Sequence, residues 1–125
     1  MNSQTPLHKA QGMGASHSGT GHFRRERATS VALIPLSLWF AYAMLGLTGT
    51  NEVTMVQFIA SPWNALLMAA FVMTSAYHMS LGLQVVIDDY VHTTGMKIFL
   101  LFLVRVIAFA IMAVSIFALI RIASV

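Results

Sequence analysis

The sequence predicts an all-α membrane protein with three transmembrane helices, and three observations lead to this prediction. Of the 125 residues, 58% are hydrophobic and only 9% are charged, whereas a typical soluble domain is about 25% charged. The apolar residues form three long runs with short polar segments between them. Each run supplies the roughly 20 residues that a helix needs to cross the hydrocarbon core. We therefore expect most of this chain to fold in lipid.

The first span is predicted over residues 29–49, with Pro35 near its second turn, where a proline can kink a helix or mark where the ordered crossing begins. Residues 50–62 are predicted to form a polar loop. The second span is expected over residues 63–87, and Pro62 suits the first turn of that helix. Its first residue, a tryptophan, has the position of an interfacial anchor.

A short polar turn over residues 88–95 leads to the third span, expected over residues 97–120. The residues before the spans, 1–26, are rich in Ser, Gly, Thr and His and lack apolar periodicity, so we expect a flexible polar tail. Residues 27–125 then form a three-helix transmembrane anchor domain. The three histidines of the tail are widely spaced, so we interpret them as solvated rather than as metal ligands: His8, His17 and His22.

The basic residues predict an orientation. Four of them precede the first span and one lies at the start of the third span, whereas the first connection has none and the short C-terminus has one: Lys9, Arg24, Arg25, Arg27, Lys97 and Arg121. The positive-inside rule places the N-terminus and the turn 88–95 on the cytoplasmic or matrix side and the C-terminus outside. Since the basic residues lie mainly at the edges of apolar runs, the net charge of +3 is explained by membrane topology, and we do not expect nucleic-acid binding.

The sequence also excludes several chemistries. It contains no cysteine, so the chain alone cannot hold a disulfide, a thiolate zinc site or an ordinary iron–sulfur cluster. It contains no glycine-rich nucleotide loop and no internal repeat of the kind found in many transporters. Redox chemistry would therefore require an organic or haem cofactor that is supplied with electrons by other chains.

His78 is the first candidate site residue, because it lies about nine residues inside the second span, or roughly 14 Å from its end. Two interpretations are open from the residue type. The imidazole could bond a carbonyl or a serine, such as Ser37 or Ser115, on a neighbouring helix, or it could be an axial ligand of haem. A haem with two imidazole ligands would then need its second histidine from another chain, because His92 lies in the polar turn.

Two further features accompany His78. Gly82 lies one helical turn later on the same face and leaves space for a flat macrocycle or for another helix. Asp89 returns to nearly the same face about three turns after His78, and Tyr90 follows it. A phenol beside a carboxylate can donate a hydrogen bond to a quinone carbonyl. From the pair alone, an interfacial tyrosine with helix-capping acids is the simpler interpretation.

Taken together, the string His78-x3-Gly82-x6-Asp89-Tyr90, at the inner end of the second of three spans, resembles the membrane-anchor D subunit of succinate dehydrogenase. The Arg-Ala-Thr segment 27–29, just before the first span, is similar to the corresponding segment of that family. The similarity extends from this segment to the end of the chain and includes the number of spans and their topology.

The resemblance implies roles for four residues. His78 would be an axial ligand of haem b, and therefore a ligand of its iron, shared with a histidine of the partner C subunit. Asp89 and Tyr90 would lie at the ubiquinone site, with the tyrosine bonded to the quinone. Arg27 would lie near the haem propionates, a pairing of cation and anion that is chemically favourable.

The resemblance also implies partners and a place in the cell. The chain would be an anchor of succinate:ubiquinone oxidoreductase that forms a helical bundle with a cytochrome b-type C subunit. It would dock an iron–sulfur subunit and a flavoprotein, and it would take part in electron transfer only within that assembly. The short chain favours a bacterial inner membrane over a mitochondrial one. Two alternatives stay open: an anchor of a fumarate reductase, and a three-helix membrane scaffold without a cofactor.

Arg105 is a charged residue at a depth in the third span comparable with that of His78. A guanidinium within a membrane usually faces a partner in the bundle. We expect Arg105 to pair with Asp88 or a haem propionate, or to extend towards the inner surface.

Overall fold

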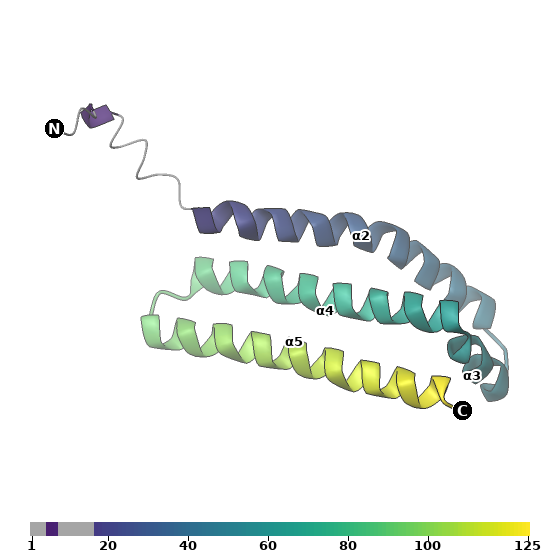
Figure 1. Ribbon diagram of the computed structural model, residues 1–125. Coiled ribbons are helices and arrows are strands. Elements are labelled where there is room, and N and C mark those ends of the chain that lie inside the picture. Colours follow the sequence, from purple (N-terminus) through teal and green to yellow (C-terminus); the bar gives the residue numbers. More distant parts are fainter. Residues whose placement is uncertain (1–4, 8–16) are drawn as a thin grey trace.

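The computed structural model describes residues 5–7 and 17–125, and four helices span most of the second range (Figure 1). These helices are α2 (His17–Leu47), α3 (Glu52–Ala60), α4 (Pro62–Tyr90) and α5 (Thr94–Ala123). Three of them, α2, α4 and α5, are long and apolar enough to cross a membrane. The predicted all-α fold is confirmed for the described residues, with three candidate membrane spans.

The first helix begins earlier than we expect from the sequence. Helix α2 starts at His17, inside the segment predicted to be a flexible tail. Local contacts stabilise this early part: the Arg25 Nε donates a hydrogen bond to the Gly21 carbonyl at 3.2 Å, and the Arg27 guanidinium lies 5.0 Å from the centre of the Phe23 ring. The rest of the predicted tail, including His8, lies largely outside the described residues.

The prediction of a loop over residues 50–62 is wrong, because most of this segment forms helix α3. Asn51 does not mark a loop but caps the helix, and its side chain accepts a hydrogen bond from the Thr54 backbone N–H at 2.9 Å. The ring of Phe58 in α3 stacks on Trp39 of α2, with 6.5 Å between ring centroids. A helix of nine residues is too short for its periodicity to stand out against two longer apolar runs.

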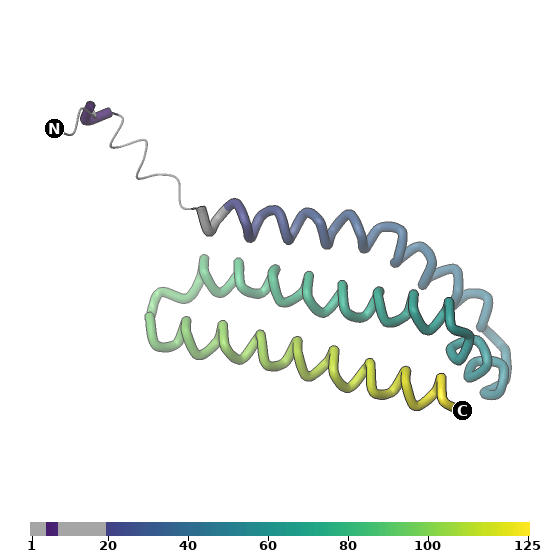
Figure 2. Tube along the Cα trace, viewed as in Figure 1, coloured from purple at the N-terminus to yellow at the C-terminus, as the bar shows by residue number. Residues whose placement is uncertain are grey.

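The three long helices run side by side in alternating directions, with α4 between α2 and α5 (Figure 2). Small residues allow close approach around α4, since Ala76 and Ser80 of α4 and Ala108 of α5 are all buried. On the other side of α4, the rings of Phe40 and Phe71 stack with their centroids 4.6 Å apart. Helix α2 contains Pro35 and curves along its length (Figure 1), as expected for a helix that lacks one backbone hydrogen bond.

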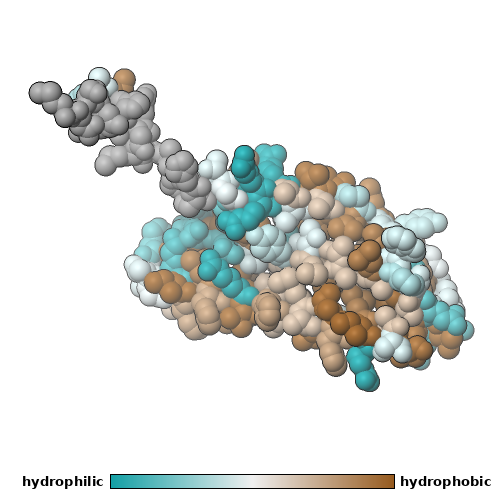
Figure 3. Space-filling model, viewed as in Figure 1, coloured by the Kyte–Doolittle hydropathy of each residue, from teal (hydrophilic) through white to brown (hydrophobic). Residues whose placement is uncertain are grey.

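The two ends of the bundle differ in charge. We call the start of α2 together with the α4–α5 turn the basic end; it carries Arg24, Arg25, Arg27 and Lys97. The largest hydrophilic groups on the face shown in Figure 3 lie at this end, whereas apolar residues cover much of the rest. The apolar residues of the long helices are largely exposed in the isolated chain. Such a surface suits lipid or other membrane helices.

Candidate cofactor site

His78 lies in the middle of α4 and contacts the first membrane-spanning helix. Its Nδ1 atom is 2.8 Å from the Oγ1 atom of Thr29 in α2, and both side chains are partly buried. The two residues are 49 positions apart in the sequence, so the contact depends on the packing of α2 against α4. The intramembrane imidazole is therefore held by a side chain of another span.

The contacts of Thr29 favour one tautomer of the imidazole. The Thr29 hydroxyl lies 2.9 Å from the carbonyl oxygens of both Arg25 and Glu26, one helical turn earlier. Its single proton therefore has two carbonyl acceptors besides His78 Nδ1. When a carbonyl takes this proton, the Thr29 oxygen accepts from the His78 Nδ1–H, and Nε2 carries the lone pair.

The surroundings of Nε2 fit a metal centre. Within the described residues Nε2 has no hydrogen-bond partner, and the His78 side chain is only partly buried. Metal-bound histidines commonly donate their second ring N–H to a neighbouring acceptor, which fixes the tautomer. One turn along α4, a Cβ placed on Gly82 would have no atom within 4 Å. An imidazole nitrogen without a protein partner, one helical turn from a glycine, is compatible with a ligand of haem iron.

The residue predicted to bond His78 is not the one found in the structure. The sequence suggested Ser37, Ser115 or a backbone carbonyl, whereas the structure gives Thr29. Thr29 is the last residue of the Arg-Ala-Thr segment 27–29, in which a role was expected for Arg27 but not for Thr29. The predicted span bounds place Thr29 at the membrane surface and His78 well inside, so nothing in the sequence suggests pairing them; the two residues lie side by side because α2 begins earlier, at His17.

Arg27 does not share the face of α2 on which Thr29 contacts His78. Two residues along a helix correspond to a rotation of 200°, which leaves Arg27 about 160° away from Thr29 around α2. Its side chain is exposed, and its guanidinium lies over the Phe23 ring. The structure thus places Arg27 at the same end of the bundle as the site but on a different face of the helix.

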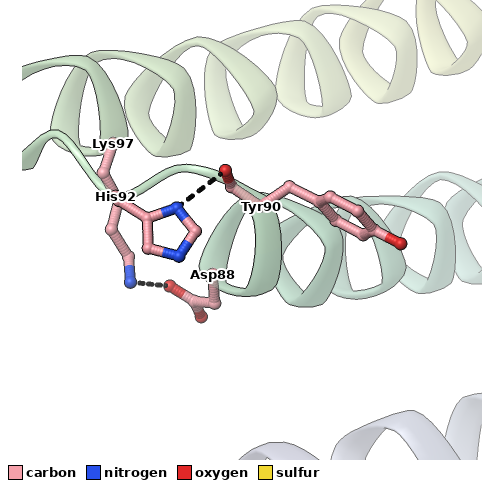
Figure 4. Close-up of polar contacts among 4 residues, drawn as sticks. All are labelled: Asp88, Tyr90, His92 and Lys97. Carbon is pink, nitrogen blue, oxygen red and sulfur yellow. Dashed lines mark hydrogen bonds and ion pairs between the residues drawn. The ribbon is translucent and has the colours of Figure 1, made fainter.

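Asp89 and Tyr90 form the last turn of α4, and both are exposed at the basic end. The Tyr90 side chain is 79% exposed, and its ring points away from the neighbouring ion pair between Asp88 and Lys97 (Figure 4). Among the described residues no hydrogen bond joins Asp89 to the Tyr90 hydroxyl. The phenol is therefore free to donate to a molecule bound at this surface.

The turn between α4 and α5 is held by two polar contacts. Lys97 Nζ lies 2.9 Å from the Asp88 carboxylate, so this acid is not the partner that we expected for Arg105. The His92 ring bonds the Tyr90 backbone carbonyl at 3.2 Å (Figure 4). These contacts stabilise the backbone around Tyr90 but do not involve the Tyr90 hydroxyl.

Comparison with known proteins identifies the family of this chain. A family model described as "succinate dehydrogenase/fumarate reductase transmembrane subunit" matches residues 1–112. The succinate dehydrogenase hydrophobic membrane anchor subunit of Paracoccus denitrificans is 30% identical over 117 residues, which cover 94% of this chain and 90% of the relative. The anchor subunit of Rickettsia bellii is 33% identical over 89 residues, 71% of each chain. That of Reclinomonas americana is 30% identical over 98 residues, 76% of this chain and 82% of the relative. The chain belongs to the succinate dehydrogenase/fumarate reductase transmembrane subunit family.

Proposed function

We propose that the chain is a membrane anchor subunit of a succinate:ubiquinone oxidoreductase, in which His78 supplies one axial ligand of haem b and Tyr90 contacts ubiquinone. The observation that carries the proposal is the hydrogen bond between His78 and Thr29, because it engages Nδ1 and leaves Nε2 without a partner among the described residues. The names of the curated relatives support the assignment to succinate dehydrogenase.

The haem would be held at the surface of α4. When bound, a b-type haem carries one electron at a time by cycling between ferric and ferrous iron. Thr29 orients the imidazole and prevents Nδ1 from turning towards the metal, while Gly82 keeps the adjacent helix surface flat. The second axial ligand comes from a partner anchor, the C subunit, which packs against the exposed apolar surface of this chain.

The quinone site would lie at the basic end. Tyr90 donates its phenolic hydrogen bond to a carbonyl oxygen of ubiquinone, an interaction that strengthens as negative charge develops on that oxygen. Asp89, on the neighbouring position, holds or releases a proton near the reduced quinone. Both residues lie at a surface that soluble subunits can reach, and these are the iron–sulfur subunit and the flavoprotein that oxidises succinate.

The charge of the two ends supports an orientation for the proposal. The basic end faces the cytoplasm, and the opposite end, with α3 and the C-terminus, faces the periplasm of a bacterial inner membrane. Electrons then arrive at Tyr90 on the cytoplasmic side, where succinate is oxidised.

A reduced-minus-oxidised optical spectrum of the purified complex tests the haem assignment. We expect the α band of a six-coordinate b-type haem in the complex and none in this chain when it is expressed alone, because one imidazole cannot supply both ligands. An intact complex without a b-type band would instead favour a cofactor-free scaffold. A six-coordinate haem in the isolated chain would contradict the shared ligation.

The spectrum does not separate succinate oxidation from fumarate reduction, and the family description includes both. Rates of quinone reduction by succinate and of fumarate reduction by quinol, measured on the same preparation, distinguish the two. We expect the first rate to exceed the second.

A further inference from the structure

A groove between α2 and α5, floored by α4, is not used by the proposed electron-transfer sites. Its volume is about 430 Å³, within the size range of sites for small ligands. His22 and Arg25 line it from α2, Arg105 lines it from α5, and Ser80 and Gln84 form its polar floor. The two arginines therefore enter one groove from opposite walls.

The positive charge in this groove has no counterpart among the described residues. No carboxylate lines the groove, and neither arginine takes part in the ion pair of the described chain, which joins Asp88 to Lys97. Arg25 uses its Nε on a backbone carbonyl, which leaves its terminal nitrogens available. Two guanidinium groups without a carboxylate form a site for an anion.

His22 provides an independent observation at the same place. Its Nε2 atom is enclosed and has no hydrogen-bond partner within the described residues. A buried polar atom without a partner is costly, and in native structures it commonly marks a ligand or an ordered water. The imidazole lies in the lining of the groove, so it would complete the polar shell around an anion held by the arginines.

The rest of the lining is apolar and indicates what carries the anion. Beyond Arg105 the groove continues over Ala108, Phe109 and Met112, residues of a helix that is long and apolar enough to span the membrane. Helices α2 and α5 are not closely packed together in the described part of the chain, so the groove lies open between them. A groove with two arginines at one end and apolar side chains along the rest suits an amphiphilic anion better than a free ion.

We propose that this groove binds one anionic phospholipid, with its phosphate between Arg25 and Arg105 and an acyl chain along Ala108, Phe109 and Met112. The lipid neutralises Arg105, whose depth in the third span the electron-transfer sites do not explain. It also fills the gap between α2 and α5. The site is separate from His78 Nε2 and Tyr90, so it does not depend on the proposed haem or quinone functions.

Native mass spectrometry of the purified, delipidated complex tests the proposal. The complex is titrated with phosphatidylglycerol or with phosphatidylcholine of the same acyl chains. We expect one phosphatidylglycerol to bind more tightly than the rest, and the double variant Arg25→Gln/Arg105→Gln to lose about tenfold or more of that affinity. Arg105→Lys keeps the positive charge and should retain most of it.

Arg121→Gln is the matched control, because this arginine lies at the far end of α5 and outside the groove. Equal binding of both lipids, or the same loss in Arg121→Gln, would overturn the proposal. Displacement of the lipid by inorganic phosphate would indicate a free-anion site and also overturn it. If Arg105→Gln does not assemble, the single variant Arg25→Gln, at an exposed position, gives the same comparison.

The haem spectrum of each variant separates this site from the haem site. We expect Arg25→Gln and Arg105→Gln to retain the haem midpoint potential of the parent complex. A shifted potential with unchanged lipid binding would show that the anion is a haem propionate and would contradict the lipid assignment.

Discussion

The Thr29 hydroxyl oxygen lies 2.8 Å from His78 Nδ1 and joins the beginning of the first span to the middle of the second. Because the same hydroxyl also lies within hydrogen-bond distance of two carbonyls of its own helix, the contact favours the tautomer with the proton on Nδ1. In the proposed function, Thr29 would thereby favour Nε2 as the nitrogen that binds the haem iron.

Replacing Thr29 by valine should weaken haem binding in the assembled complex. The valine keeps the shape of threonine but cannot accept the Nδ1–H bond, so the imidazole loses both its orientation and its tautomer preference. Loss of such an outer partner typically lowers metal affinity by about 10- to 100-fold. Haem content and midpoint potential, measured by redox titration of the optical spectrum, report the change.

Two controls accompany this variant. Thr29→Ser retains the hydroxyl and should restore the parent values. Ser30→Ala removes a hydroxyl that bonds the Glu26 carbonyl but does not contact His78, so it should leave the haem unchanged. A Thr29→Val complex with the haem content and potential of the parent would exclude the positioning role.

A large side chain at Gly82 should exclude the haem without disturbing this chain. A Cβ atom at Gly82 would have no neighbouring heavy atom within 4 Å, so a side chain can begin there without a clash, and replacing a helical glycine also favours the helix. We expect the complex to assemble with little or no haem. Gly46→Leu is the matched control, since a Cβ there also meets no atom within 4 Å but the residue lies near the C-terminal end of α2. Equal haem content in the two variants would show that the macrocycle does not lie beside Gly82.

Tyr90→Phe should slow quinone reduction while the haem spectrum stays intact. The substitution removes only the exposed hydroxyl, and loss of a single hydrogen-bond donor to a developing negative charge commonly costs about 100-fold or more in kcat. Steady-state rates over a range of ubiquinone concentrations measure the effect. Tyr42→Phe removes an equally exposed hydroxyl near the opposite end of the bundle and should change nothing. Unaltered kinetics in Tyr90→Phe would remove the tyrosine from the quinone site.

The ion pair between Asp88 and Lys97 should contribute little to stability. The two side chains are 53% and 35% exposed, and pairs of this kind contribute about 0–1 kcal/mol. Lys97→Met should therefore change the thermal unfolding midpoint of the complex only slightly and leave the haem band intact. A double-mutant cycle with Asp88→Asn measures the pair energy, and a value of several kcal/mol would mean that partner subunits bury the turn.

Much of the fold could be predicted from sequence because the bilayer imposes strong constraints. Three apolar runs of sufficient length gave the three spans, and Pro62 marked the start of α4 as expected for the first turn of a helix. The short helix α3 could not be predicted in this way. Its cap, Asn51, is a residue type as common in loops as at helix ends, and only the accepted bond from Thr54 distinguishes the two.

For the candidate site, too, the sequence predicts the residue type and its depth but not the contacts between helices. His78 could be identified because an intramembrane histidine is costly and needs a partner. The contact between His78 and Thr29 could not be predicted, because this contact depends on the rotation of α2 against α4, which the residue pattern does not determine. For the same reason the sequence did not reveal that Arg27 lies on another face of α2, or that Arg25 and Arg105 share a groove.

The optical spectrum of a His78→Ala complex tests the central proposal most directly, with His92→Ala as the control because that histidine lies in the α4–α5 turn. The account predicts that the six-coordinate b-type α band is lost or replaced by a five-coordinate spectrum in His78→Ala and is unchanged in His92→Ala. An unaltered six-coordinate haem in an assembled His78→Ala complex would contradict it.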